Sequence, residues 1–374
     1  MNIFENLIYS FAFLTDKYIG FSFTEYILNW YENRLINKYL SKEEISTQQI
    51  PTINKDELTK EIFIQLSNNY KTPVLIKGYL KDTEAVKKWD EKYLCEIIND
   101  FNLEILKKEN NDLIVKDYNF NEFIEKVKTE NIYLNNNSSI FYNFPEIFND
   151  IKDKFYEFVN LLKNTGLRNI HMSHFFIGYN NKNKVSGTNM HCAGNGNFFC
   201  MIKGKKQWTF IDPKYSYLLK GRVAPSGIHA QTLCDMPDTE ISYYPEIIKH
   251  IPRFETTLEP GDLLWNAPWW WHRIKNINIQ ENEYNIAIAI RNNKVSLINI
   301  KNNLLYTISG YTYLLYNSLF LTIYEKLFYK KHKNFNINDT KQKTNILQAI
   351  KFLTDKYPNT IHYDDIISKN PKNK

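Results

Sequence analysis

Two histidines lie far apart in the chain, each beside a tight turn at the end of a short strand-like stretch. His191 lies in TNMHCAG, and His272 ends the rigid aromatic run NAPWWWH. Side chains alternate along a strand, so we expect His191 and Ala193 to face one way and Cys192 the other. A β-barrel can bring such distant positions together, and imidazole nitrogen is a common metal ligand. The pair therefore predicts a metal site with His191 and His272 as ligands.

The elements that must position these histidines are short strands that follow one another after residue 170. Aromatic-rich apolar runs separated by turns include HFFIGY, NFFCMIK, KQWTFID and YNIAIAIRN. The segment 222–257 is long and carries several prolines and glycines. We expect it to be an insertion that covers the barrel mouth as a lid, with His229 exposed. His171 and His174 are expected on a neighbouring strand in structural roles.

Helical patterns flank this β region on both sides. Residues 1–49 predict an aromatic-rich helical cap, 50–295 the barrel domain, and 296–374 a C-terminal helical region with a basic tail. Residues 304–324 contain no charge but several hydroxyl and amide side chains. We interpret them as buried helices that could form a homodimer interface, and the alternative is association with a membrane.

Charge and cysteine content narrow the class of protein. The net charge of +6 is carried entirely by residues 330–374, so the rest of the 374-residue chain is formally neutral. A neutral body argues against a nucleic-acid partner, because gripping phosphates requires clustered positive charge. The four cysteines form no C-x-x-C pair, which suits free thiols in a reducing compartment. With no signal-peptide pattern at the start, we expect a cytoplasmic protein.

Several motifs occur together and in a specific order. His191 is followed by NFF (197–199) and IKGKK (202–206), and much later by PGD (260–262) and WWH (270–272). Upstream are PVLIKGYL (73–80) and IYL (132–134). This pattern resembles the JmjC/cupin-like superfamily of Fe(II)- and 2-oxoglutarate-dependent oxygenases. It is most similar to the branch containing the asparaginyl hydroxylase of the hypoxia response.

The resemblance implies a fold, a site and two cofactors. The fold is mainly β with flanking helices: a double-stranded β-helix, that is, a jelly-roll barrel of the cupin/JmjC type. His191 and His272 would bind Fe(II). The residues that would bind 2-oxoglutarate are Lys206, which would pair with its distal carboxylate, and Thr188, Tyr133 and Asn197. Any one motif alone would be weak, but the joint pattern is specific.

One position departs from the family pattern. Ala193 stands where the family has the aspartate or glutamate that completes a two-histidine, one-carboxylate triad. Cys192 should face away, and Asp262 lies too far from His272 to replace that carboxylate. Three interpretations remain: a hydroxylase of unknown substrate with an incomplete triad, an inactive binding or scaffold protein, and a halogenase with chloride at the vacancy.

Overall fold

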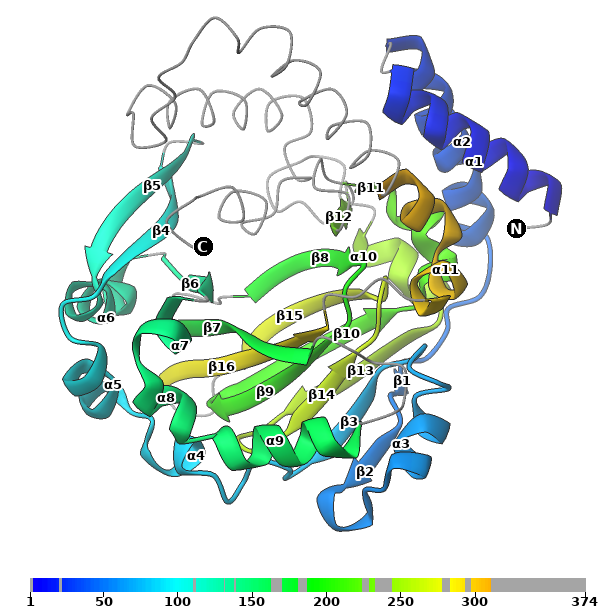
Figure 1. The fold of residues 1–374 in the computed structure, drawn as a ribbon. Helices are drawn as coiled ribbons and strands as arrows, with labels where there is room; N and C mark the ends of the chain where they lie inside the picture. The colour runs from blue at the N-terminus through cyan, green and yellow to red at the C-terminus, as the bar shows by residue number, and fades with distance from the viewer. Residues whose placement is uncertain are drawn as a thin grey trace, which may run out of the picture.

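The computed structural model describes residues 3–19, 22–109, 112–130, 132–137, 139–162, 170–180, 187–223, 229–232, 244–277, 283–292 and 297–310. Its centre consists of two seven-stranded sheets (Figure 1). The first has the spatial order β1 (Gln48–Gln49), β13 (Arg253–Leu258), β10 (Lys205–Ile211), β15 (Trp271–Ile277), β8 (Gly187–Ala193), β12 (His229–Thr232), β11 (Gly221–Val223). The second has the order β2 (Thr52–Asn54), β3 (Val74–Lys77), β14 (Leu263–Asn266), β9 (Asn197–Lys203), β16 (Glu283–Asn292), β7 (Ile170–Asn180), β6 (Leu134–Asn137).

This arrangement is the jelly-roll fold predicted from the sequence, with strands that are far apart in sequence paired side by side. The two sheets remain separate in the described residues, so the structure is a sandwich there and not a closed barrel. The turn between β9 and β10 needs a glycine. Gly204 has a φ of +78°, and a Cβ there would lie 2.4 Å from Oδ1 of Asn285.

Period-two alternation decides which side chains of the first sheet face the second sheet. On β10, Lys206, Trp208 and Phe210 are buried and alternate with the less buried Lys205, Gln207 and Thr209. Trp208 and Phe210 belong to the core between the sheets. Trp270 belongs to that core as well, whereas Trp271 lies in a second core on the outer face of the first sheet.

Two N-terminal helices cover that outer face. Helices α1 (Ile3–Ile19) and α2 (Ser22–Leu40) contribute Tyr9, Phe13 and Leu28 to the second core. Cys192 of β8 lies in the same core, so its side chain points away from the space between the sheets, as predicted. A buried ion pair between Glu32 of α2 and Arg222 of β11 ties the helices to the sheet.

Most of the remaining helices precede β7, and Figure 1 shows them around the second sheet. They are α3 (Lys60–Leu66), α4 (Glu84–Lys88), α5 (Glu91–Ile98), α6 (Phe120–Thr129), α7 (Ser139–Asn143), α8 (Pro145–Asn149) and α9 (Lys152–Leu161), with the hairpin β4 (Asn102–Glu109) and β5 (Asp112–Asn119) between α5 and α6. Side-chain N-caps begin four of them, because an oxygen of Thr59, Thr83, Asp90 or Asn119 accepts a bond from a first-turn amide. The later helices are α10 (Tyr244–Ile247) and α11 (Leu297–Asn302), and 3-10 turns occupy Lys55–Glu57, Pro213–Leu219 and Ile248–His250.

The segment 222–257 differs from the predicted lid. It supplies β12 and most of β13 to the first sheet, and His229, which we expected to be exposed, is 2% exposed on β12. The prediction was wrong because a proline-rich segment forms strands only where other strands pair with it. Those partner strands lie elsewhere in the sequence, so the local pattern does not reveal them. Residues 224–228 and 233–243 of this segment lie outside the described ranges.

The C-terminal predictions can be followed only as far as Gly310. Residues 304–310 are helical, and the rest of the uncharged stretch 304–324 and the basic tail lie outside the described residues. Within the described ranges, no helix has both the length and the apolar character needed to cross a bilayer. The predicted homodimer contact through the C-terminal helices stays a prediction.

Candidate functional site

The two predicted metal ligands lie side by side between the sheets. β8 and β15 run antiparallel, and His191 and His272 are direct partners in their register. Residues paired in this way project to the same face, and here the two ring centroids are 4.2 Å apart. His272 is 4% exposed and stacks on Trp208, with ring centroids 5.3 Å apart.

Backbone carbonyls orient both imidazoles. Nδ1 of His191 lies 2.8 Å from the carbonyl oxygen of Asn189, and Nδ1 of His272 lies 2.9 Å from that of Trp270. A carbonyl can only accept a hydrogen bond, so Nδ1 carries the proton in each ring. The lone pair of a neutral ring is then on Nε2, and this is how metal-binding histidines are commonly held. An Nδ2 atom of Asn266 lies 3.4 Å from Nε2 of His272.

A β-bulge brings Thr188 to the same face as the histidines. Between the pairs His191–His272 and Thr188–Ile274, β8 advances three residues while β15 advances two. Without the bulge, alternation would point Thr188 and His191 to opposite faces of the sheet. The extra residue in β8 turns Thr188 to the face of His191. No local pattern around Thr188 predicts this bulge.

Lys206 is a buried cation without an anion. It is 2% exposed, and its Nζ donates to Oδ1 of Asn276 at 2.5 Å and to Oη of Tyr133 at 3.4 Å. Both partners are neutral, and no carboxylate of the described residues forms an ion pair with it. Burial lowers the pKa of Lys206 from 10.5 to about 7, because nothing nearby compensates the desolvated charge.

Tyr133 is held over Lys206 by close packing on a glycine. A Cβ at Gly178 of β7 would lie 2.6 Å from the Tyr133 ring. The ring also stands 5.6 Å from the Lys206 ammonium, within cation–π range. Burial raises the pKa of Tyr133, so its hydroxyl stays protonated and can donate to an anion.

The register orders the inner face of the first sheet into three rows. Phe210, His272 and His191 form the first row, Trp208, Ile274 and Thr188 the second, and Lys206 and Asn276 the third. In the middle row, Thr188 Oγ1 and Trp208 Nε1 are buried without a hydrogen-bond partner among the described residues. Buried polar atoms are normally paired, so two unpaired ones between the histidines and the lysine are the mark of a place for a polar ligand.

Asn197 is on β9 of the second sheet and lies near the histidine end of the site. It pairs with Asn266 in the β9–β14 register, and Asn266 is the residue beside His272. Oδ1 of Asn197 and Oδ1 of Asn266 are both buried without partners in the described part of the chain. The sequence therefore predicted two groups, one at each end, as if they were a single cluster.

Sequence reasoning missed Asn276, Asn266 and Trp208 as members of the site. A signal for Asn276 did exist: it lies four residues beyond His272 on one strand, so alternation puts both on one face. Asn266 offered no comparable signal, because a bend at Pro268 separates it from His272. Trp208 belongs to the core between the sheets, and its unpaired indole N–H adds a polar role.

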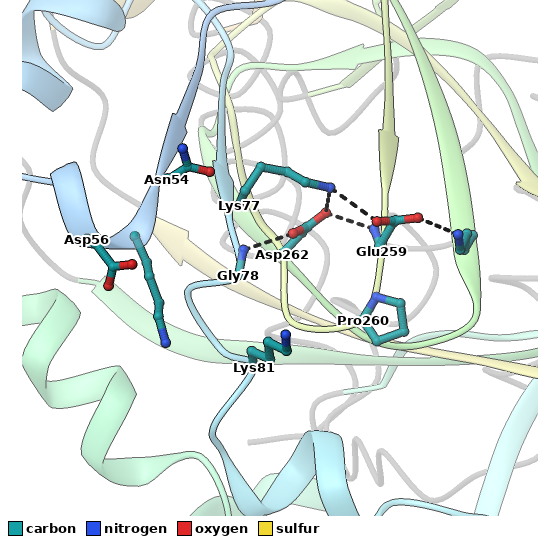
Figure 2. Close-up of a pocket in the computed structure, with 10 residues that line it drawn as sticks. Asn54, Asp56, Lys77, Gly78, Lys81, Glu259, Pro260 and Asp262 are labelled. Carbon is teal, nitrogen blue, oxygen red and sulfur yellow. Dashed lines mark hydrogen bonds and ion pairs between the residues drawn. The ribbon is translucent and has the colours of Figure 1, made fainter.

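Asp262 is excluded as a substitute for the missing carboxylate, as predicted. Its oxygens accept bonds from the amides of Gly78 and Glu259, at 2.9 Å each, and from Lys77 Nζ at 2.7 Å. Figure 2 shows these contacts at the Pro-Gly-Asp turn. The hollow that these residues line has a volume of about 580 Å³. Lys77 and Lys205 both pair with Glu259 there, so the charges of the hollow largely satisfy one another.

The described residues contain no group of three His, Cys, Asp or Glu side chains already arranged around a metal position. Ala193, two residues after His191 on β8, contributes only a methyl group beside the histidine pair. The pair alone provides two nitrogen ligands, and a divalent metal needs further ligands from a cosubstrate, water or another side chain.

Comparison with protein-family models agrees with the fold and the register. A model described as a cupin-like domain matches residues 60–290, which is more than half of the 374-residue chain. The match spans every strand that carries the histidine pair, the buried lysine and the unpaired polar atoms between them. The chain belongs to the family of cupin-like domains.

Proposed function

We propose that this protein is an Fe(II)- and 2-oxoglutarate-dependent oxygenase of the JmjC type, similar to the asparaginyl hydroxylase branch, and that it hydroxylates a substrate yet to be identified. His191 and His272 bind Fe(II) through Nε2. Lys206, Thr188 and Tyr133 bind 2-oxoglutarate, and Asn197 lies at the metal end. The family membership supports the fold, and the inner face of the first sheet supports the chemistry.

The buried Lys206 is the observation that carries this proposal. An ammonium held in a dry interior by two neutral groups is costly, and an incoming carboxylate would remove that cost. Lys206 and Tyr133 Oη would donate to the distal carboxylate of 2-oxoglutarate. Lys205 on the same strand shows the contrast, because it faces outward and pairs with Glu259.

The spacing of the rows fits a short dicarboxylate that also reaches a metal. From His272 to Asn276 the strand advances four residues, or roughly 13 Å. The Lys206 side chain and a five-carbon acid together can span that distance. Thr188 Oγ1 and Trp208 Nε1 lie in the row between and could donate to the ligand.

Bound Fe(II) and 2-oxoglutarate would supply the oxidation: oxygen is split between the substrate, which gains a hydroxyl group, and 2-oxoglutarate, which becomes succinate and CO₂. The protein's own contribution is to hold both groups in place and to exclude water. Trp208, Phe210 and Trp270 form an apolar wall beside His272. A dry wall strengthens the electrostatic contacts inside the site.

The test is an anaerobic titration of the purified protein with Fe(II), with and without 2-oxoglutarate. We expect 2-oxoglutarate to tighten Fe(II) binding, and Lys206→Ala to weaken 2-oxoglutarate binding at least tenfold. Lys205→Ala is the matched control and should bind as the wild type does. Equal 2-oxoglutarate affinity in the two variants would overturn the cosubstrate assignment. Absence of binding of both ligands to the wild type would instead indicate a scaffold protein.

A further inference from the structure

We propose that His229 is the third protein ligand of the metal and takes the place of the carboxylate absent at Ala193. This inference deepens the proposed function and rests on it. It changes the character of the site: three neutral imidazoles replace two imidazoles and one negative charge. The ligand set would be complete without chloride or a second carboxylate.

The pairing of β12 with β8 places His229 beside the vacancy. These strands are antiparallel, with His229 opposite Ala193, Ala230 opposite Cys192 and Gln231 opposite His191. Directly opposed residues share a face, so His229 projects to the face that carries His191 and His272. The intervening pair confirms the assignment, because Ala230 and Cys192 both lie in the core under the N-terminal helices.

Size and burial favour this exchange of ligands. A carboxylate at position 193 would reach the metal from β8 itself, and alanine leaves that volume open. Opposed side chains on neighbouring strands have Cβ atoms roughly 4.5–5.5 Å apart, and an imidazole is longer than an aspartate side chain. His229 can therefore reach over Ala193 from the next strand. It is 2% exposed, so it is within the interior and not on a surface loop.

The chemistry of the ligand set is consistent with a divalent metal. Imidazole suits iron, zinc, nickel and copper, and three histidines form known metal centres. A site with three neutral ligands keeps the full positive charge of the metal, which would favour the anionic 2-oxoglutarate. In the described residues no three such side chains converge as they stand. The proposal thus requires the His229 side chain to change rotamer when metal binds.

The experiment measures anaerobic Fe(II) affinity, and the absorption spectrum of the Co(II) form, for wild type and variants of the full chain. We expect His229→Ala to weaken Fe(II) binding at least tenfold and to change the Co(II) ligand-field bands. Gln207→Ala is the control and should leave both unchanged, because Gln207 alternates with the inward-facing Lys206 and Trp208 and pairs with Glu255. The double variant His229→Ala/Ala193→Asp should recover affinity, because it restores the family carboxylate.

Melting temperatures measured without metal show whether each variant is folded. His229→Gln provides a second variant with a side chain of similar volume. Wild-type affinity and spectrum in a folded His229 variant would overturn the inference while leaving the proposed function intact. A wild type that binds neither Fe(II) nor Co(II) would overturn both. Loss of affinity in His229→Ala without recovery by Ala193→Asp would place His229 near the metal in a supporting role only, against the proposal.

Discussion

Two buried cations of the first sheet, one on its edge strand β11 and one on β10, are satisfied in opposite ways. Arg222 on β11 faces α2, where NH1 and NH2 donate to the two oxygens of Glu32 at 2.7 and 2.9 Å. Burial acts to lower the pKa of Arg222, but the Glu32 carboxylate more than offsets this and the pKa is raised. Lys206 on β10 faces the second sheet with two neutral partners, and its pKa falls to about 7.

The difference separates a structural charge from a binding charge. A buried cation that finds its anion within the chain stabilises one arrangement of the two elements it joins. A buried cation that lacks an anion weakens the ligand-free fold and gains from any carboxylate that enters. The two cases look alike in the sequence, because each is a basic residue in a strand that contains no acidic residue.

The largest expected effect on stability comes from breaking the ion pair between Glu32 and Arg222. Glu32→Ala leaves Arg222 buried without its anion, and we expect a loss of about 3–5 kcal/mol in the free energy of unfolding. Urea unfolding at neutral pH measures it. Glu246→Ala is the control, because it removes the exposed Glu246–Lys249 pair and should cost less than about 1 kcal/mol. Equal unfolding midpoints would mean that Arg222 is not buried as described.

A smaller effect should appear in the pH dependence of stability. With a folded pKa of about 7 and an unfolded value of 10.5, Lys206 is deprotonated in the folded state while the unfolded chain keeps its proton. The unfolded state then binds more protons, so stability should rise with pH between these values, by about 2 kcal/mol from pH 7 to pH 9. Lys206→Met should remove this rise.

The measurement is urea unfolding at several pH values without ligand, with Lys205→Met as the matched control that keeps the rise. Saturating 2-oxoglutarate should reverse the trend in the wild type, because its carboxylate favours the protonated lysine and binding weakens as pH increases. The free energy of unfolding of the wild type, plotted against pH, could instead be flat or parallel to that of Lys206→Met. Either result would show that an anion of the protein itself already pairs with Lys206.

The smallest effect on stability is expected at Thr188. Its Oγ1 is buried without a partner in the described residues, so Thr188→Val removes no hydrogen bond. We expect stability to be unchanged or higher by up to about 1 kcal/mol. Affinity for 2-oxoglutarate should nevertheless fall several-fold, measured by calorimetry with Fe(II) present. A destabilised variant with normal affinity would reverse the assignment and make Thr188 structural.

Much of the fold and part of the site followed from local pattern. Alternation along β8 correctly turned Cys192 away from the space between the sheets. The jelly-roll fold followed from motif order, and the family match over 60–290 agrees with it. These inferences succeed because side-chain direction along a strand depends on neighbours that are adjacent in sequence.

The sequence by itself determined the chemical groups: two histidines, a lysine, and an alanine two residues after the first histidine. Only the tertiary structure decided which other groups meet them. The bulge in β8 turned Thr188 inward, the pairing of β10 with β15 joined Lys206 to Asn276, and the pairing of β12 with β8 set His229 opposite Ala193. The physical reason is that strand partners, register and bulges are set by contacts between segments distant in sequence, which no local pattern contains.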